Sequence, residues 1–73
     1  MTKDERIGHR ITVQRAVLRM NQAELARRVG VAQSYISMLE RGERPLTDEL
    51  LQRIAAALEC KPEYFLREFQ EVA

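Results

Sequence analysis

The pattern of small and apolar residues between Gln22 and Leu39 constrains the fold of this chain more than any other feature. At about 100° per residue, these residues form the inner sides of two short helices. They are Leu25, Ala26 and Val29 in the first helix and Ile36 and Leu39 in the second. Gly30 permits a positive φ angle in the turn between the helices, and Val31 fills the angle. Together these features predict a helix-turn-helix over about residues 21–41.

The outer side of the second of these helices carries small polar side chains. With Gln33 at 0°, four residues follow within about 140°: Ser37, Arg41, Ser34 and Met38. Most of these groups can donate and accept hydrogen bonds, as recognition of base edges in a DNA major groove requires. An ordinary corner between two helices is the alternative interpretation of the spacing, and this polar strip counts against it.

Helical spacing recurs along the rest of the chain, and alternating strand patterns are absent. The prediction is an all-α chain with helices over about residues 2–19, 21–29, 33–41, 47–58 and 62–70. Thr2, Asn21 and Thr47 are suited to cap helix N-termini, and Pro62 suits a first helical turn. Ala32 precedes the third helix and offers no capping oxygen, which costs roughly 0.5–2 kcal/mol.

The length of 73 residues indicates one small domain, residues 1–73, with a thin core. Its single cysteine, Cys60, allows no internal disulfide, so a second subunit is the candidate for extra support and a reducing compartment is expected. No apolar run suits a membrane helix or a signal peptide, and we therefore expect a cytoplasmic protein with no membrane contact. His9 has no ligand partner at a useful spacing, so neither a metal nor a cofactor is expected.

The charges are distributed unevenly along the chain. Residues 1–45 carry nine basic and five acidic side chains, a balance of +4, whereas residues 46–73 carry three basic and six acidic ones, a balance of −3. A polyanion would therefore meet the first part of the chain.

The run MNQAELARRVGVAQSYISMLERGERP resembles the helix-turn-helix of the phage repressor and Cro type, the XRE family. The resemblance extends from about Ile7 to Leu66. It implies a compact, five-helix, lambda-repressor-like domain whose third helix enters the major groove of double-stranded DNA. It also implies a homodimer on a pseudo-palindromic operator.

The resemblance also suggests roles for individual residues. The expected base-reading residues are Gln33, Ser34, Ser37 and Met38. The expected contacts to the DNA backbone come from Gln22, Tyr35, Arg41, Arg44 and Arg10. Gln22 matches a glutamine that also braces the reading glutamine, here Gln33. Gln33 is the residue whose amide can bond adenine through two hydrogen bonds.

Two further pairs of residues are expected to act within or between subunits. Arg15 and Glu40 match a partly buried ion pair that links the first helix to the third. Tyr64 and Phe69, in the bulky last helix, are candidates either for core packing or for a dimer contact.

The sequence therefore predicts a DNA-binding transcriptional regulator, either a repressor or a controller. Phage switches, restriction-modification controllers and mobile-element regulators all share this pattern. The alternative is an antitoxin or adaptor that kept the fold and binds a toxin or another protein. An enzyme is disfavoured, because Ser34 and Ser37 lack a paired histidine and the chain has no phosphate-binding loop.

Overall fold

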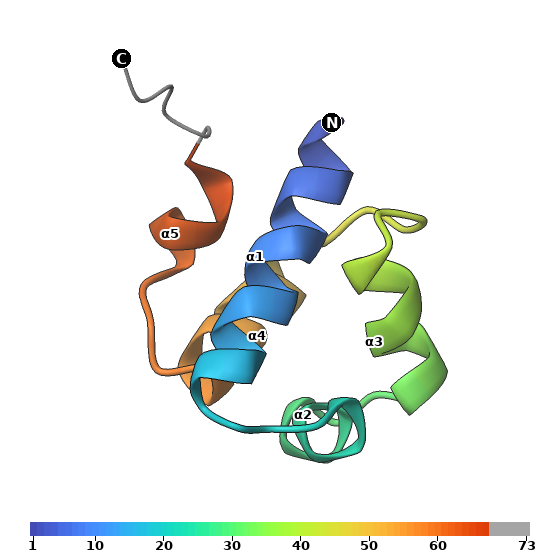
Figure 1. Cartoon of the computed structure of the whole chain (residues 1–73), viewed down its shortest axis with the longest axis vertical. Helices are drawn as coiled ribbons and strands as arrows, with labels where there is room; N and C mark the ends of the chain where they lie inside the picture. The colour runs from blue at the N-terminus through green and yellow to red at the C-terminus, as the bar shows by residue number, and fades with distance from the viewer. Residues whose placement is uncertain (68–73) are drawn as a thin grey trace.

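The computed structural model describes residues 1–67, which form five helices and no strand (Figure 1). The helices are α1 (Lys3–Val17), α2 (Gln22–Val29), α3 (Gln33–Glu40), α4 (Asp48–Ala57) and α5 (Pro62–Leu66). The predicted all-α, five-helix fold is confirmed, and α2 and α3 form the helix-turn-helix. The expected span of α5 was too long, because the backbone is already extended at Arg67. Phe69, a candidate dimer contact, lies outside the described residues.

Side chains cap three of the helices as expected. Thr2 and Glu5 form a reciprocal capping box, in which the Glu5 amide donates to Thr2 Oγ1 at 3.1 Å. Asn21 accepts from the Glu24 amide at 2.8 Å, and Thr47 accepts from the Leu50 amide at 3.2 Å. These bonds satisfy amide groups that the first turn of a helix leaves without an intrahelical partner.

The core lies where α1 meets α3 and α5, and where α2 meets α3 and α4. Figure 1 shows α1 between α3 on one side and α5 on the other. The largest fully buried side chains come from all five helices and the segment after α4: Ile11, Leu25, Ile36, Ile54, Leu58 and Phe65. Within residues 1–67, no helix combines the length and apolar character needed to span a membrane.

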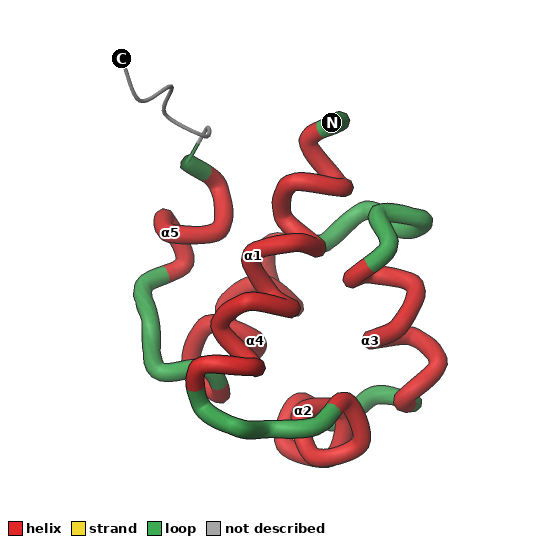
Figure 2. The backbone as a smooth tube through the Cα atoms, in the orientation of Figure 1, coloured by secondary structure: helices red, strands yellow, loops and turns green. Residues whose placement is uncertain are grey.

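Gly8 sets the distance between α1 and α3. A Cβ atom at this position would lie 2.3 Å from the carbonyl oxygen of Leu39 and 2.6 Å from that of Glu40. Any side chain here would therefore collide with the backbone at the end of α3, and glycine allows the two helices to touch. The loop that follows α3 then runs back past the N-terminal half of α1 toward α4 (Figure 2).

Candidate nucleic-acid interface

The two sides of α3 differ as predicted. Ile36 and Leu39 are buried in the core, whereas Gln33 and Ser34 are exposed. Ser37 and Met38 are half-buried at the edge of the exposed strip. The structure thus brings the four expected base-reading residues onto one short helix. Of these, Gln33 and Ser34 at its N-terminal end are the most accessible to solvent.

The turn between α2 and α3 holds these helices at a fixed angle. Gly30 has a φ of 85°, the left-handed conformation predicted for it, and its amide donates to the Ala26 carbonyl at 2.8 Å. The Val31 amide donates to the same carbonyl at 3.0 Å. Ala32 is the N-cap residue of α3, and its side chain forms no capping hydrogen bond. The expected gap in capping is therefore present, although the Tyr35 amide donates to the Ala32 carbonyl at 3.1 Å.

A cluster of polar side chains centred on Glu40 anchors the other end of α3. Arg15 on α1 donates from Nε to Glu40 Oε2 at 2.8 Å and from Nη2 to Oε1 at 3.0 Å. Thr12 Oγ1, also on α1, and Gln22 Nε2 on α2 each donate to Glu40 Oε1 at 3.0 Å. The ion pair expected between Arg15 and Glu40 is present, and it belongs to a network that joins three helices.

The Glu40 carboxylate is well satisfied in its buried position, where its side chain is only 6% exposed. Burial acts to raise the pKa of this carboxyl, but the hydrogen bonds from Arg15, Gln22 and Thr12 outweigh burial and hold the pKa below its ordinary value. Glu40 is therefore ionised at neutral pH, and its charge is matched by the Arg15 guanidinium.

The structure gives Gln22 a different partner from the one expected. Its side-chain amide donates to Glu40 at 3.0 Å, so this residue braces the end of α3 instead of Gln33. An amide nitrogen carries two hydrogens, and one of them can still serve a phosphate.

The expected backbone contacts are placed in different surroundings. Arg41 and Arg44 are exposed just after α3. Tyr35 is half-buried and packs partly against the core. Arg10 lies with its guanidinium 5.0 Å from the centre of the Tyr64 ring, on the side of α1 that faces α5. The structure therefore places Arg10 on the α5 side of α1, away from α3. Its expected contact with a phosphate stays a prediction, which DNA binding by Arg10→Ala tests.

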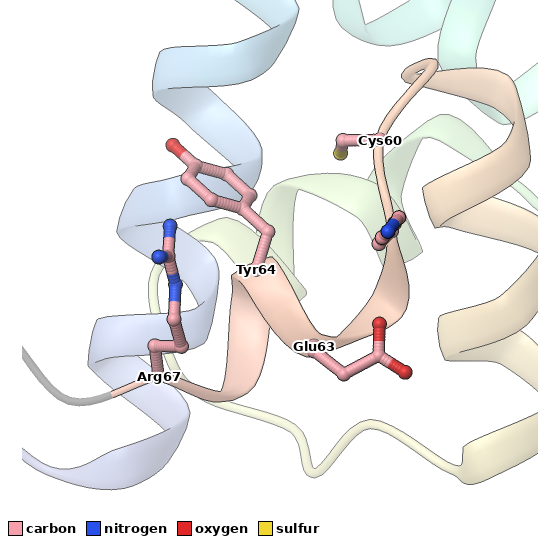
Figure 3. A pocket seen from close by; sticks show the side chains of 5 residues that line it. Cys60, Glu63, Tyr64 and Arg67 are labelled. Atoms are coloured by element: carbon pink, nitrogen blue, oxygen red, sulfur yellow. The ribbon is translucent and has the colours of Figure 1, made fainter.

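Tyr64 takes part in packing within the chain. Its ring meets the Phe65 ring edge to face at a centroid distance of 5.1 Å, and the Arg67 guanidinium lies 5.6 Å from its centre. Figure 3 shows the Tyr64 ring directed toward α1 with Arg67 beside it, at the edge of an open depression that Cys60 also lines. Burial raises the pKa of the Cys60 thiol, which favours a packing role over a reactive one.

Three residues of this region escaped sequence reasoning. Gly8 sets the contact of α1 with α3, Thr12 donates to Glu40, and Glu43 binds Arg41. Gly8 and Thr12 are one turn apart on the same side of a helix as Ile11, which was a usable signal. Glu43 lies in a loop, where spacing predicts no partner. Within residues 1–67, no group of three or more His, Cys, Asp and Glu side chains is placed to hold a metal ion.

Comparisons with known proteins place this geometry in a family. A family model described as "Helix-turn-helix" matches residues 14–65. The chain is 39% identical over 61 residues to "Repressor protein C2" of Salmonella phage P22, covering 84% of this chain and 28% of that protein. It is 34% identical over 67 residues to an "Uncharacterized transcriptional regulator in ATPase CF(0) region" of Rhodospirillum rubrum, covering 92% of this chain and 62% of that one. The chain thus spans less than two thirds of either relative.

Solved structures show the same fold. The P22 c2 repressor in complex with a synthetic operator superposes with a TM-score of 0.79 at 39% identity, covering 84% of this chain and 92% of that one. The restriction-modification controller protein C.AhdI of Aeromonas hydrophila also gives a TM-score of 0.79, at 28% identity over 82% of this chain and 91% of that one. With its fold, its turn and most of its length matched, the chain belongs to the XRE-type helix-turn-helix family.

Proposed function

We propose that this protein is a sequence-specific DNA-binding transcriptional regulator that places α3 in the major groove. The observation that carries the proposal is the contrast between the two sides of α3. Its inner side is locked by apolar packing and by the Glu40 network, while its outer side presents small polar groups. A reading helix needs both, because base recognition depends on hydrogen-bonding groups held at a fixed depth and angle.

The relatives support this proposal. One is named a repressor, another is named a transcriptional regulator, and the c2 repressor was crystallised with a synthetic operator. The charge distribution agrees, since the positive balance lies in residues 1–45, which include the whole helix-turn-helix.

Within this proposal the residues divide into two groups. Base contacts come from Gln33, Ser34, Ser37 and Met38 on α3. Backbone contacts come from Gln22, Tyr35, Arg41 and Arg44. Base contacts choose the sequence, whereas phosphate contacts position the protein and supply affinity that is independent of sequence.

We also propose that the protein binds DNA as a homodimer. The end of α5 supports a contact there, because Leu66, a large apolar side chain, keeps 42% of its surface exposed. Two copies would then place their α3 helices in successive major grooves about 34 Å apart, on a pseudo-palindromic site.

Selection of DNA from random duplexes at about 0.1–0.2 M salt tests the proposal directly. We expect two related half-sites whose centres are separated by about one helical turn, or 10–10.5 base pairs. A selected pool with no sequence preference would contradict the proposed function.

Substitution of Gln33 and Arg44 distinguishes base reading from backbone contact. Gln33→Ala should relax the preference at one base pair in each half-site, at a cost of about 1–3 kcal/mol on the selected site. Arg44→Ala should weaken binding to all sequences alike and make the salt dependence less steep by about 0.9 per subunit in log–log units. Salt titrations on the selected site and its single-base variants measure both effects. If the two variants changed binding in the same way, the division into readers and anchors would be wrong.

A further inference from the structure

The guanidinium of Arg41, which follows α3 directly, is held by two neighbours. Its Nη1 donates to Ser37 Oγ at 2.6 Å, one turn earlier in the chain. Its Nε donates to Glu43 Oε2, and Nη2 lies 3.4 Å from Glu43 Oε1. Two nitrogens thus face two carboxylate oxygens, which is the forked geometry of a strong ion pair. Ser37, Arg41 and Glu43 form one hydrogen-bonded unit at the C-terminal end of the exposed strip.

This unit places a negative charge on the surface that is proposed to meet DNA. The hydrogen bond from Arg41 holds the pKa of the Glu43 carboxyl below its ordinary value, and the charge of Arg44 acts in the same direction. Glu43 is therefore ionised at neutral pH and neutralises Arg41 in the free protein. A DNA phosphate that approaches Arg41 must compete with this carboxylate.

We propose that Glu43 is a specificity determinant of DNA binding, because it holds Arg41 on Ser37 and competes with backbone phosphate for the guanidinium. The inference rests on the proposed function, since it requires that α3 and the residues after it contact DNA. It assigns an inhibitory role to a residue that no sequence pattern singled out.

The competition should act mainly on non-specific binding. Phosphates are the same at every sequence, and a cation already neutralised by Glu43 adds little to affinity for arbitrary DNA. At the operator, base contacts hold the protein in register, so binding depends less on a free charge at Arg41.

The contact with Arg41 also affects which base-edge atoms the Ser37 hydroxyl can bind. Its hydroxyl oxygen accepts from a cationic donor, which polarises the O–H bond and favours the hydroxyl as a donor toward DNA. Acceptor atoms on base edges, such as guanine N7 and O6 or thymine O4, suit this arrangement better than the amino group of cytosine.

The test compares Glu43→Gln with the unmodified protein on random duplex DNA and on the selected operator. We expect affinity for random DNA to rise about twofold to fivefold, the scale of a released surface ion pair. The salt dependence should steepen by about 0.9 per subunit, one more phosphate contact. The ratio of operator to random affinity should fall, and the preference at the base read by Ser37 should weaken.

Glu49→Gln is the matched control. Glu49 forms an exposed ion pair with Arg53 on α4 at 2.8 Å, so its substitution makes the same change in net charge outside the Ser37, Arg41 and Glu43 unit. It should leave the ratio of operator to random affinity unchanged. Equal effects of the two variants would overturn the inference, because net charge alone would then explain them.

Two Arg41 variants complete the test. In an Arg41→Ala background, Glu43→Gln should no longer raise affinity for random DNA, and a persisting rise would show that Glu43 repels phosphate directly and would overturn the inference. Arg41→Lys keeps the charge, but its ammonium cannot form the same forked contact, so it should lower the specificity ratio as Glu43→Gln does. An unchanged ratio would count against the inference.

The two proposals fail separately. If the unmodified protein shows no sequence preference, the proposed function is wrong. If it selects an operator but Glu43→Gln behaves like Glu49→Gln, only the inference about Glu43 is wrong.

Discussion

Glu40 shows how much of this surface depends on a single residue. Its two oxygens accept four hydrogen bonds from three side chains on α1 and α2. The carboxylate is almost fully covered, and the Arg15 side chain keeps only 18% of its surface exposed. A buried ion pair adds little stability compared with well-packed apolar side chains in its place. Removal of one partner, however, leaves an unpaired charge in a site that excludes water. Its value here lies in orientation, because it joins the end of α3 to both preceding helices.

The Glu40 network makes the stability of the fold sensitive to acid. The pKa of Glu40 is lower in the folded chain than in the unfolded one, so at acidic pH the unfolded state binds more protons. The stabilisation is complete above the unfolded pKa, about 4.3, and is lost as pH falls through the lower folded pKa. We expect Glu40→Gln to cost about 3 kcal/mol at pH 7, because it strands the Arg15 charge. The difference should narrow progressively below about pH 4.5.

Urea unfolding at pH 7, 5 and 3.5, followed by circular dichroism, measures this difference. Glu49→Gln is again a suitable control, because its exposed pair with Arg53 should contribute little at any pH. A difference between the unmodified protein and Glu40→Gln that stays constant across the series would show that the charge of Glu40 does not stabilise the fold.

At the scale of single helices, α3 begins without a side-chain cap, as does the short α5. α1, α2 and α4 receive a side-chain cap, whereas α3 begins at Ala32 with no capping bond from that side chain and no acidic residue in its first turn. The same helix is firmly held at its other end by Glu40. An exposed helix N-terminus attracts anions, so the weak end of α3 is suited to a phosphate of bound DNA.

A cap at Ala32 should therefore stabilise the free protein. We expect Ala32→Ser to raise the free energy of unfolding by roughly 0.5–2 kcal/mol and to slow hydrogen exchange at the Ser34 amide. Ala56→Ser, the same change at an exposed position of α4, should instead be neutral or slightly destabilising. Unfolding curves and exchange rates that match between Ala32→Ser and the unmodified protein would indicate that the start of α3 is already satisfied.

At the scale of the whole molecule, α1 separates two surfaces. One of its sides packs on α3 through Gly8, Thr12 and Arg15, and the other packs on α5. Figure 1 shows that α3 and α5 lie on opposite sides of α1. A dimer contact through α5 would therefore leave the exposed strip of α3 uncovered.

Arg10 provides a test of this separation. Arg10→Ala removes the cation–π contact with Tyr64 and should lower the free energy of unfolding by about 0.5–1 kcal/mol. The affinity of Arg10→Ala for DNA should depend on salt concentration as steeply as that of the unmodified protein, whereas the dependence for Arg44→Ala should be less steep. A less steep salt dependence for Arg10→Ala would mean that the α5 side of α1 also meets the DNA backbone.

Much of this protein could be predicted from its sequence alone. The caps at Thr2, Asn21 and Thr47, the positive φ of Gly30 and the apolar inner side of α3 follow from residues within one or two turns of each other. Short-range signals of this kind depend on local backbone geometry, which is why the capped starts of α1, α2 and α4 and the turn at Gly30 were found correctly.

The tertiary structure decided which side chains meet across helices. The bonds to Glu40 from Thr12, Arg15 and Gln22 span 28, 25 and 18 residues. Those from Thr12 and Arg15 depend on the close crossing of α1 and α3 at Gly8, and that from Gln22 depends on the packing of α2 on α3. Local periodicity carries no information on such crossings, so neither the bond of Gln22 to Glu40 nor the contact of Arg10 with Tyr64 was expected. The sequence by itself determined most of the helix positions and the polar strip of α3. Packing between helices determined how firmly the Glu40 network holds that strip, because its bonds join residues that are far apart in the sequence.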